Sequence, residues 1–312
     1  MSTKNRIQII EIGFWVGLII FWFFPGEGNT GAWTQKKGDY FFKLSVNYLF
    51  ADKEFNHRGE KVNILEDFEV YRNATFTDLS LIAYLEYGLF DRLTVVSNLP
   101  YKISWAQREE LSNYFRSRKR TLTSTGFSDW TIAGRYLFLR NPIVLSAQIG
   151  VKLPLGYKKT PDNEGPALGT GEMDGEGQLL IGKSLYPLPI YMTSGIGYRS
   201  RRGALNDEYV FMAEVGYSRG PVVLKVAIDG VKNTHTPPDL YGSLVVSPLP
   251  GGGGTIPDIL YGDQDYTKVS PGIIFKFNDE YGIQFDAIHI IAGKNIISGT
   301  IFSLGIVKIK SR

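Results

Sequence analysis

The chain has 312 residues, of which 43% are hydrophobic and 13% are aromatic, and its formal net charge is +3. This small charge, without a dense basic run beyond residues 116–120, argues against nucleic-acid binding. The absence of cysteine excludes disulfides, thiolate metal sites and a cysteine-linked lipid anchor.

The N-terminus has the pattern of a secretory signal peptide. Two basic residues precede an apolar segment at residues 12–24, and small residues follow it. We expect a signal peptide at residues 1–32 with cleavage after Ala32, and cleavage after Gly26 or Gly28 is an alternative. A retained membrane helix is a further alternative, although the apolar segment is short against the roughly 20 residues that a span needs.

The first regular pattern after this segment is a strict alternation at residues 40–50. Aromatic and aliphatic residues at even positions oppose Lys43, Ser45 and Asn47 at odd positions. A period of two is that of a β-strand with one apolar face. The following residues 51–77 are polar and irregular, so we expect a long loop there.

Residues 79–101 have the pattern of a β-hairpin. Two alternating arms of about ten residues flank turn-forming residues at 88–92, and an arm of that length is enough for a tilted strand to cross a bilayer. In this hairpin we expect Leu85 to face lipid and Glu86 to point into a barrel.

Hairpins of the same kind follow along the rest of the chain. Short turns alternate with long polar connections at residues 106–124, 156–173 and 231–264. The further expected strands lie at residues 129–139, 143–154, 175–184, 190–199, 207–218, 222–230, 268–277, 281–292 and 298–309.

The total of about twelve strands is even, which lets both chain ends lie on the same side of a membrane. Short turns on one side and long loops on the other are typical of outer-membrane barrels. We therefore predict an all-β fold, an antiparallel up-and-down transmembrane β-barrel that occupies residues 33–312.

A soluble β-sandwich, or a closed barrel with an apolar interior, is the alternative fold, because its strands would alternate as well. Four observations favour the membrane barrel. They are the secretory signal, strand lengths near the membrane thickness, the asymmetry of the loops, and ionisable residues on the face opposite the aromatic ones.

The polar faces of the strands should line the barrel interior, because charged side chains are costly against lipid. They would form a polar pathway for a small solute, and a plugged barrel whose charges pair to fill space is the alternative. The expected lumen-lining residues are Lys43, Ser45, Asn47, Glu86, Arg135, Gln148, Lys152, Glu214, Lys225, Lys268, Lys276, Gln284 and Asp286.

Four segments resemble the outer-membrane barrel family named for the MetA pathway of phenol degradation. They are AWTQKKGDYFFKLSVNYLF at residues 32–50, YGLFDRLTVVSNLPY at 87–101, GFSDWTIAGRYLF at 126–138 and QIGVKLPLGYKK at 148–159. The resemblance implies a channel or transporter in the outer membrane of a Gram-negative-type bacterium, and some members are associated with uptake of aromatic compounds. We therefore expect passive passage of a small hydrophobic or aromatic solute.

One departure from the bacterial barrel pattern concerns the chain end at residues 308–312. Bacterial barrels usually finish on an aromatic residue, whereas this chain ends on Ser311 and Arg312. The departure weakens the signal for the barrel-assembly machinery, which is an expected partner together with outer-membrane lipid and lipopolysaccharide.

Two other functional classes compete with a channel. The first is a non-transporting structural or surface-receptor barrel whose long loops carry the function. The second is an outer-membrane hydrolase, which needs a histidine with a nucleophilic serine two residues later. The histidines at positions 57, 235 and 289 are followed at that spacing by Gly59, Pro237 and Ile291, so we expect no enzyme and no catalytic residues.

Two further motifs have weaker functional interpretations. The segment ALGTGEMDGEGQ at residues 167–178 has neither P-loop nor EF-hand spacing, so we expect an external loop and no cofactor or metal. The basic residues Arg116, Arg118, Lys119 and Arg120 could contact lipopolysaccharide, and a solvated loop is the alternative.

Overall fold

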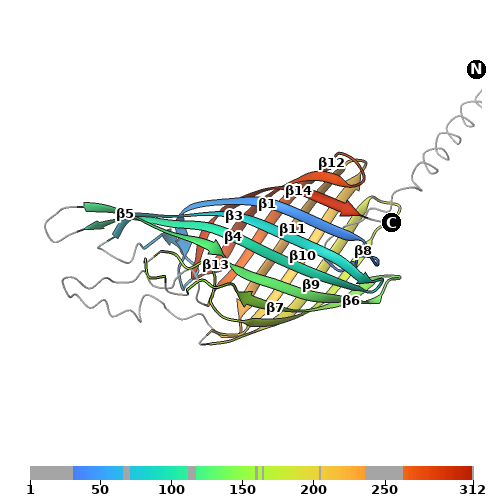
Figure 1. The fold of residues 1–312 in the computed structure, drawn as a ribbon, viewed down its shortest axis with the longest axis horizontal. Helices are drawn as coiled ribbons and strands as arrows, with labels where there is room; N and C mark the ends of the chain where they lie inside the picture. The colour runs from blue at the N-terminus through green and yellow to red at the C-terminus, as the bar shows by residue number, and fades with distance from the viewer. Residues whose placement is uncertain are drawn as a thin grey trace, which may run out of the picture.

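The chain folds into a closed antiparallel β-barrel of twelve strands (Figure 1). This confirms the predicted fold class. In the described part of the chain no helix is long and apolar enough to cross a membrane. The computed structural model describes residues 31–65, 71–111, 117–158, 161–163, 165–203, 205–235 and 263–310.

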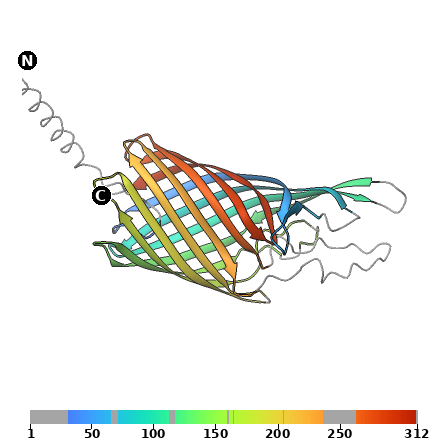
Figure 2. The same ribbon diagram turned by 180° about the vertical axis from the view of Figure 1, so that it is seen from behind.

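Each barrel strand pairs with its neighbours in chain order, and β14 pairs with β1 to close the ring. Seen from behind, the strands are strongly tilted (Figure 2), as closure of a sheet into a barrel requires. The barrel strands are β1 (Tyr40–Phe55), β3 (Tyr71–Phe90), β4 (Leu93–Leu111), β6 (Asp129–Leu139), β7 (Val144–Pro154), β8 (Asp174–Ser184), β9 (Ile190–Arg201), β10 (Glu208–Arg219), β11 (Val222–Asn233), β12 (Asp265–Lys276), β13 (Tyr281–Lys294) and β14 (Ile296–Lys310).

Two expected loops contain strand structure, which corrects the sequence-based boundaries. Within residues 51–77, β1 continues to Phe55, the short strand β2 (Lys61–Asn63) pairs with it, and β3 already begins at Tyr71. Within residues 106–124, β4 continues and pairs with β5 (Ser117–Phe127), so that this hairpin projects well beyond the barrel (Figure 1). Outside the membrane both faces of a strand can contact water, so the apolar alternation disappears although the backbone pairing continues.

The two ends of the barrel differ in the length of their connections. At one end β1 begins opposite the end of β14, and all the connections are turns of two to five residues, such as Gly220–Pro221 between β10 and β11. The β4–β5 hairpin and the long connections lie at the other end (Figure 1). We expect the short-turn end to face the periplasm, as in outer-membrane barrels, and we name the two ends periplasmic and extracellular on this basis.

The outer face of the barrel is apolar. Ile149 is 74% exposed and Leu81 is 45% exposed, and aromatic neighbours such as Tyr136 and Phe138 pack edge to face with ring centroids 5.2 Å apart. Such a surface is stable only against hydrocarbon, because exposed apolar area of this extent is unfavourable in water.

Candidate functional site

The candidate site is the inner wall of the barrel. Strand register and side-chain contacts place all thirteen predicted residues on the face opposite the exposed apolar side chains. Their role in solute passage stays a prediction. Ten of them belong to three groups of contacts that are described below. Gln284 belongs to the first group through its hydrogen bonds of 3.0 and 2.7 Å to Asp286.

The first group, which we call the lumen ladder, contains four charged side chains and one tyrosine on five strands. Lys43 Nζ on β1 lies 3.8 Å from Asp286 Oδ2 on β13. Lys225 Nζ on β11 lies 3.7 Å from Asp286 Oδ1 and 3.4 Å from Glu214 Oε2 on β10. The hydroxyl of Tyr191 on β9 donates a hydrogen bond of 2.8 Å to the other oxygen of Glu214. Each charge in the ladder therefore has a partner of opposite sign.

Glycines on the inner wall make room for the lumen ladder. A Cβ at Gly272 on β12 would lie 2.2 Å from Asp286 Oδ1. Because Gly272 has no side chain, Asp286 on β13 reaches across β12 to Lys225 on β11. A Cβ at Gly216 on β10 would lie 2.1 Å from the ring of Tyr191. The ladder thus depends on the absence of side chains at these positions.

The second group, which we call the Arg135 cluster, lies on β3, β6 and β7. Arg135 Nη1 lies 3.1 Å from Glu86 Oε1, and the two side chains are only 5% and 0% exposed. Tyr84 donates a 2.6 Å hydrogen bond to Glu86, and Arg135 donates one of 3.0 Å to Gln148. A buried ion pair of this kind is tolerated when further hydrogen bonds satisfy its remaining atoms.

A short segment before β1 lies against the inner wall at the periplasmic end. We call residues 32–35 the N-terminal strap. Sequence reasoning did not find it, because four residues without periodicity carry no signal of secondary structure. Its five hydrogen bonds to the wall, with the donor first, are Ala32 N to Thr193 Oγ1 (3.2 Å), Ser146 Oγ to Ala32 O (2.7 Å), Arg135 Nη1 to Trp33 O (3.0 Å), Gln35 N to Thr94 Oγ1 (2.8 Å) and Gln35 Nε2 to Glu86 Oε2 (3.1 Å).

A third network of charges lines the lumen nearer the extracellular end. Arg201 Nη1 donates a 2.7 Å hydrogen bond to Glu208 and lies 3.6 Å from Asp263 Oδ1. Arg199 bonds Glu176 on β8 and Glu208 on β10, at 2.7 and 2.6 Å. Lys152 pairs with Asp174 and Asp129, and Lys268 with Asp229. Of these residues only Lys152 and Lys268 were among the predicted ones. Asp263 precedes β12, and the others follow the same inward alternation.

The segment expected to be an external loop packs against this network. Ala167 and Leu168 are buried, and the hydroxyl of Ser128 donates a hydrogen bond to the carbonyl of Leu168. In the short β9–β10 connection, a hydrogen bond from the Tyr198 hydroxyl lowers the pKa of Asp207. The β7–β8 connection is therefore held against the barrel at Ser128.

Other residues with predicted roles lie away from the lumen. Lys119 and Arg120 form ion pairs of 3.5 and 3.3 Å with Glu109 and Glu110 across the β4–β5 hairpin, whereas Arg116 lies outside the described residues. The His289 ring contacts Thr300 on the outer face. Among the described residues no group of three or more side chains is arranged to hold a metal ion.

No protein-family model and no curated protein matches the chain. The structure is similar to that of the COG4313 outer membrane channel from Pseudomonas putida F1, with a TM-score of 0.63 and 14% sequence identity over 91% of this chain and 98% of that chain. The Ralstonia pickettii toluene transporter TbuX has a TM-score of 0.44 and 8% identity over 88% of this chain and 90% of that chain, too distant to carry an argument. The first likeness shows the fold of an outer-membrane barrel.

Proposed function

We propose that this protein is a channel in the outer membrane of a Gram-negative-type bacterium, and that it gives passive passage to a small hydrophobic or aromatic solute. The observation that carries the proposal is the contrast between the apolar outer face and an inner wall lined by paired charges. A wall of this kind offers hydrogen-bond donors and acceptors to a solute in transit. The segments that resemble the MetA family support the same assignment.

Aromatic side chains on the inner wall support the choice of solute. Phe41 and Tyr84 pack edge to face with ring centroids 6.1 Å apart, and Val307 and Ile309 pack beside Phe41. These apolar surfaces lie next to the carboxylate of Glu86, which Tyr84 contacts. Within this cluster Phe41, Val307 and Ile309 are buried and Tyr84 is only partly buried, so the Tyr84 ring is the surface that a small aromatic molecule would contact.

Reconstitution of the purified protein tests the proposal. We expect discrete conductance steps in planar bilayers, and faster uptake of benzenesulfonate than of gluconate into liposomes that contain the protein. Benzenesulfonate is suitable because it stays ionised at neutral pH and so does not cross lipid unaided. The absence of both channel events and uptake would refute the proposal. Equal uptake of the two anions would refute the aromatic preference alone.

A non-transporting structural or receptor barrel is the second candidate function. The observation that favours it is the packing at the extracellular end, where Leu168 is buried and the β4–β5 hairpin extends beyond the barrel. The absence of conductance steps in planar bilayers that contain normally assembled protein would favour this candidate.

The proposed maturation can be tested on the same preparation. We propose removal of residues 1–32, so the intact mass should correspond to a chain that begins at Trp33. Such a chain keeps the three strap hydrogen bonds made by Trp33 and Gln35. A mass that includes Ala32 would refute this cleavage position and would retain the other two bonds.

A further inference from the structure

The N-terminal strap contacts side chains from several neighbouring strands of the barrel. Its hydrogen-bond partners lie on β9, β7, β6, β4 and β3, which with β8 form a continuous run of strands. All five partners are side chains on the inner wall that are less than 5% exposed: Glu86, Thr94, Arg135, Ser146 and Thr193. In a chain that begins at Trp33, the strap keeps its hydrogen bonds to Arg135 on β6, Thr94 on β4 and Glu86 on β3, and these fix it to the wall.

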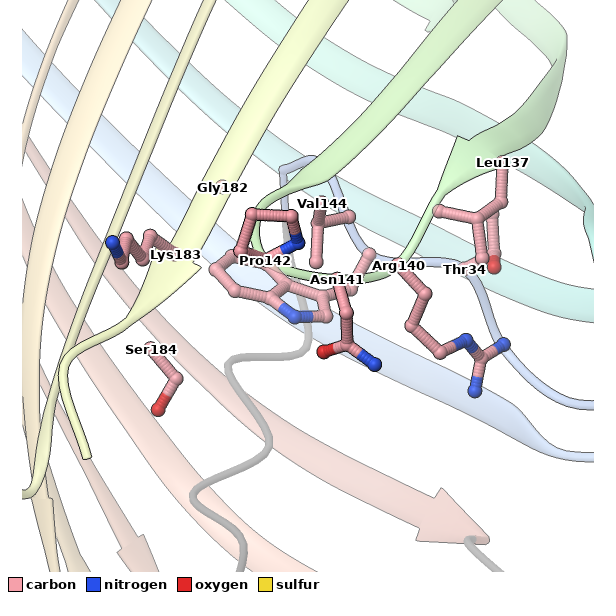
Figure 3. Close-up of a pocket in the computed structure, with 10 residues that line it drawn as sticks. Thr34, Leu137, Arg140, Asn141, Pro142, Val144, Gly182, Lys183 and Ser184 are labelled. Atoms are coloured by element: carbon pink, nitrogen blue, oxygen red, sulfur yellow. The ribbon is translucent and has the colours of Figure 1, made fainter. Parts of the chain in front are cut away.

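Trp33 is the bulky side chain of the strap. Its ring packs edge to face on Tyr191 with centroids 6.0 Å apart. A Cβ at Gly182 on β8 would lie 2.8 Å from the indole, so the wall is hollowed by a glycine where the indole lies. A recess of about 300 Å³ remains beside the strap, between the strap, the β6–β7 turn at Asn141 and Pro142, and Lys183 of β8 (Figure 3).

The strap and the two groups of lumen charges together surround the lumen, and we call them the ring. Tyr191 contacts both Trp33 and Glu214, so the strap meets the lumen ladder on β9. On the other side Glu86 accepts hydrogen bonds from both Gln35 and Arg135. The lumen ladder then continues around the remaining strands from Glu214 to Lys43, which lies on β1 beside β3.

We propose that the N-terminal strap, with Trp33 as its bulky side chain, is the constriction that sets the size limit of the channel. The inference rests on the proposed function, because a size limit requires a solute pathway. Trp33 is a specificity-determining residue in this arrangement, since the indole occupies lumen cross-section that a smaller side chain would leave open. The charges of the ring hold the strap in place.

Replacement of Trp33 by alanine tests the inference. We expect W33A to raise single-channel conductance severalfold and to admit larger sugars in liposome swelling assays with a graded series from arabinose to raffinose. W33F should stay close to the native size limit, because it retains a ring. The matched control is W130A, which removes the same volume from the outer face, where Trp130 bonds Ser97.

The outcomes separate the inference from the proposed function. Native conductance that W33A leaves unchanged would overturn the inference and leave the channel intact. If W33A conducts and the native protein does not, the result would support the strap as the constriction. It would also refute the proposal that solutes pass through the native protein. Silence of the native protein and of both Trp33 variants, with normal assembly on gels, would overturn both. An increase shared by W130A would also overturn the inference, because it would not originate in the lumen.

Discussion

Leu85 and Glu86 are neighbours in the chain, yet they belong to two different surfaces. Leu85 lies on the outer face of β3, among residues that contact only apolar surroundings in a membrane, whereas Glu86 is completely buried on the inner face. The environment of Leu85 is uniform, and any apolar residue of similar size satisfies it. Glu86 has three specific partners, Arg135, Tyr84 and Gln35.

The difference shows that the two faces are specified in different ways. On the outer face, each residue is determined independently by its free energy of transfer from water to hydrocarbon. The inner face is set by matched groups on strands that lie far apart in sequence, such as Lys43 and Asp286. Substitutions on the two faces should therefore fail for different reasons.

The largest effect is expected from Glu86→Ala. This variant leaves Arg135 buried without its carboxylate, and loss of one partner of a buried ion pair costs about 3–5 kcal/mol. Denaturant unfolding of the purified barrel, followed by heat-modified mobility on gels, measures the loss. The control E86Q keeps a hydrogen-bond acceptor and should lose less. Native stability of E86A would show that the Arg135 cluster does not hold the wall together.

A charge at the neighbouring position tests the outer face. Leu85→Arg places a guanidinium against lipid, which costs about 2–4 kcal/mol near the bilayer midplane and less toward the interfaces. We expect a reduced fraction of assembled barrel in vesicles, whereas L85A, which adds no charge, should assemble normally. Normal assembly of L85R would contradict the assignment of this face to lipid.

A glycine substitution tests the packing of the lumen ladder. In Gly272→Ala the new methyl group would meet Asp286 Oδ1 at 2.2 Å, and overpacking of this kind costs about 1–3 kcal/mol. Gly175→Ala is the matched control, because a Cβ there has no neighbour within 4 Å. Equal unfolding midpoints for the two variants would argue that the ladder shifts at no cost.

The smallest effect is expected from Tyr191→Phe. The variant loses only the hydroxyl that donates to Glu214, which costs about 1 kcal/mol. Tyr209→Phe alters a residue on the outer face that is 56% exposed and should leave stability unchanged. The same unfolding assay compares the two variants. An unfolding midpoint of Y191F equal to that of Y209F would show that the Tyr191 hydroxyl does not stabilise the lumen ladder.

The barrel wall was predictable because its signal is local. Alternation at positions such as Leu44 and Ser45 repeats in every strand, and turn residues such as Gly220 and Pro221 mark the reversals. The extensions of β4 and β5 were missed because their side chains meet water on both faces. In these strands cross-strand ion pairs such as Lys119–Glu109 and Arg120–Glu110 supplement the backbone pairing, and such pairs leave no apolar alternation in the sequence.

The contacts within the lumen were less predictable than its wall. Alternation assigns Arg135 and Glu86 to the inner face, but their contact depends on strand tilt and on which strands are neighbours. The strap position of Trp33 depends on partners more than 60 residues away along the chain, such as Arg135. No local pattern encodes such a contact.

The ring at the periplasmic end is electrically balanced, and this has a consequence for ion flow. Its three cationic side chains, Lys43, Lys225 and Arg135, are matched by three anionic ones, Asp286, Glu214 and Glu86. Side chains that balance in this way exert little force on one ion sign over the other. Under a salt gradient these six side chains should therefore contribute little to the reversal potential, so that they leave discrimination between solutes to size and shape.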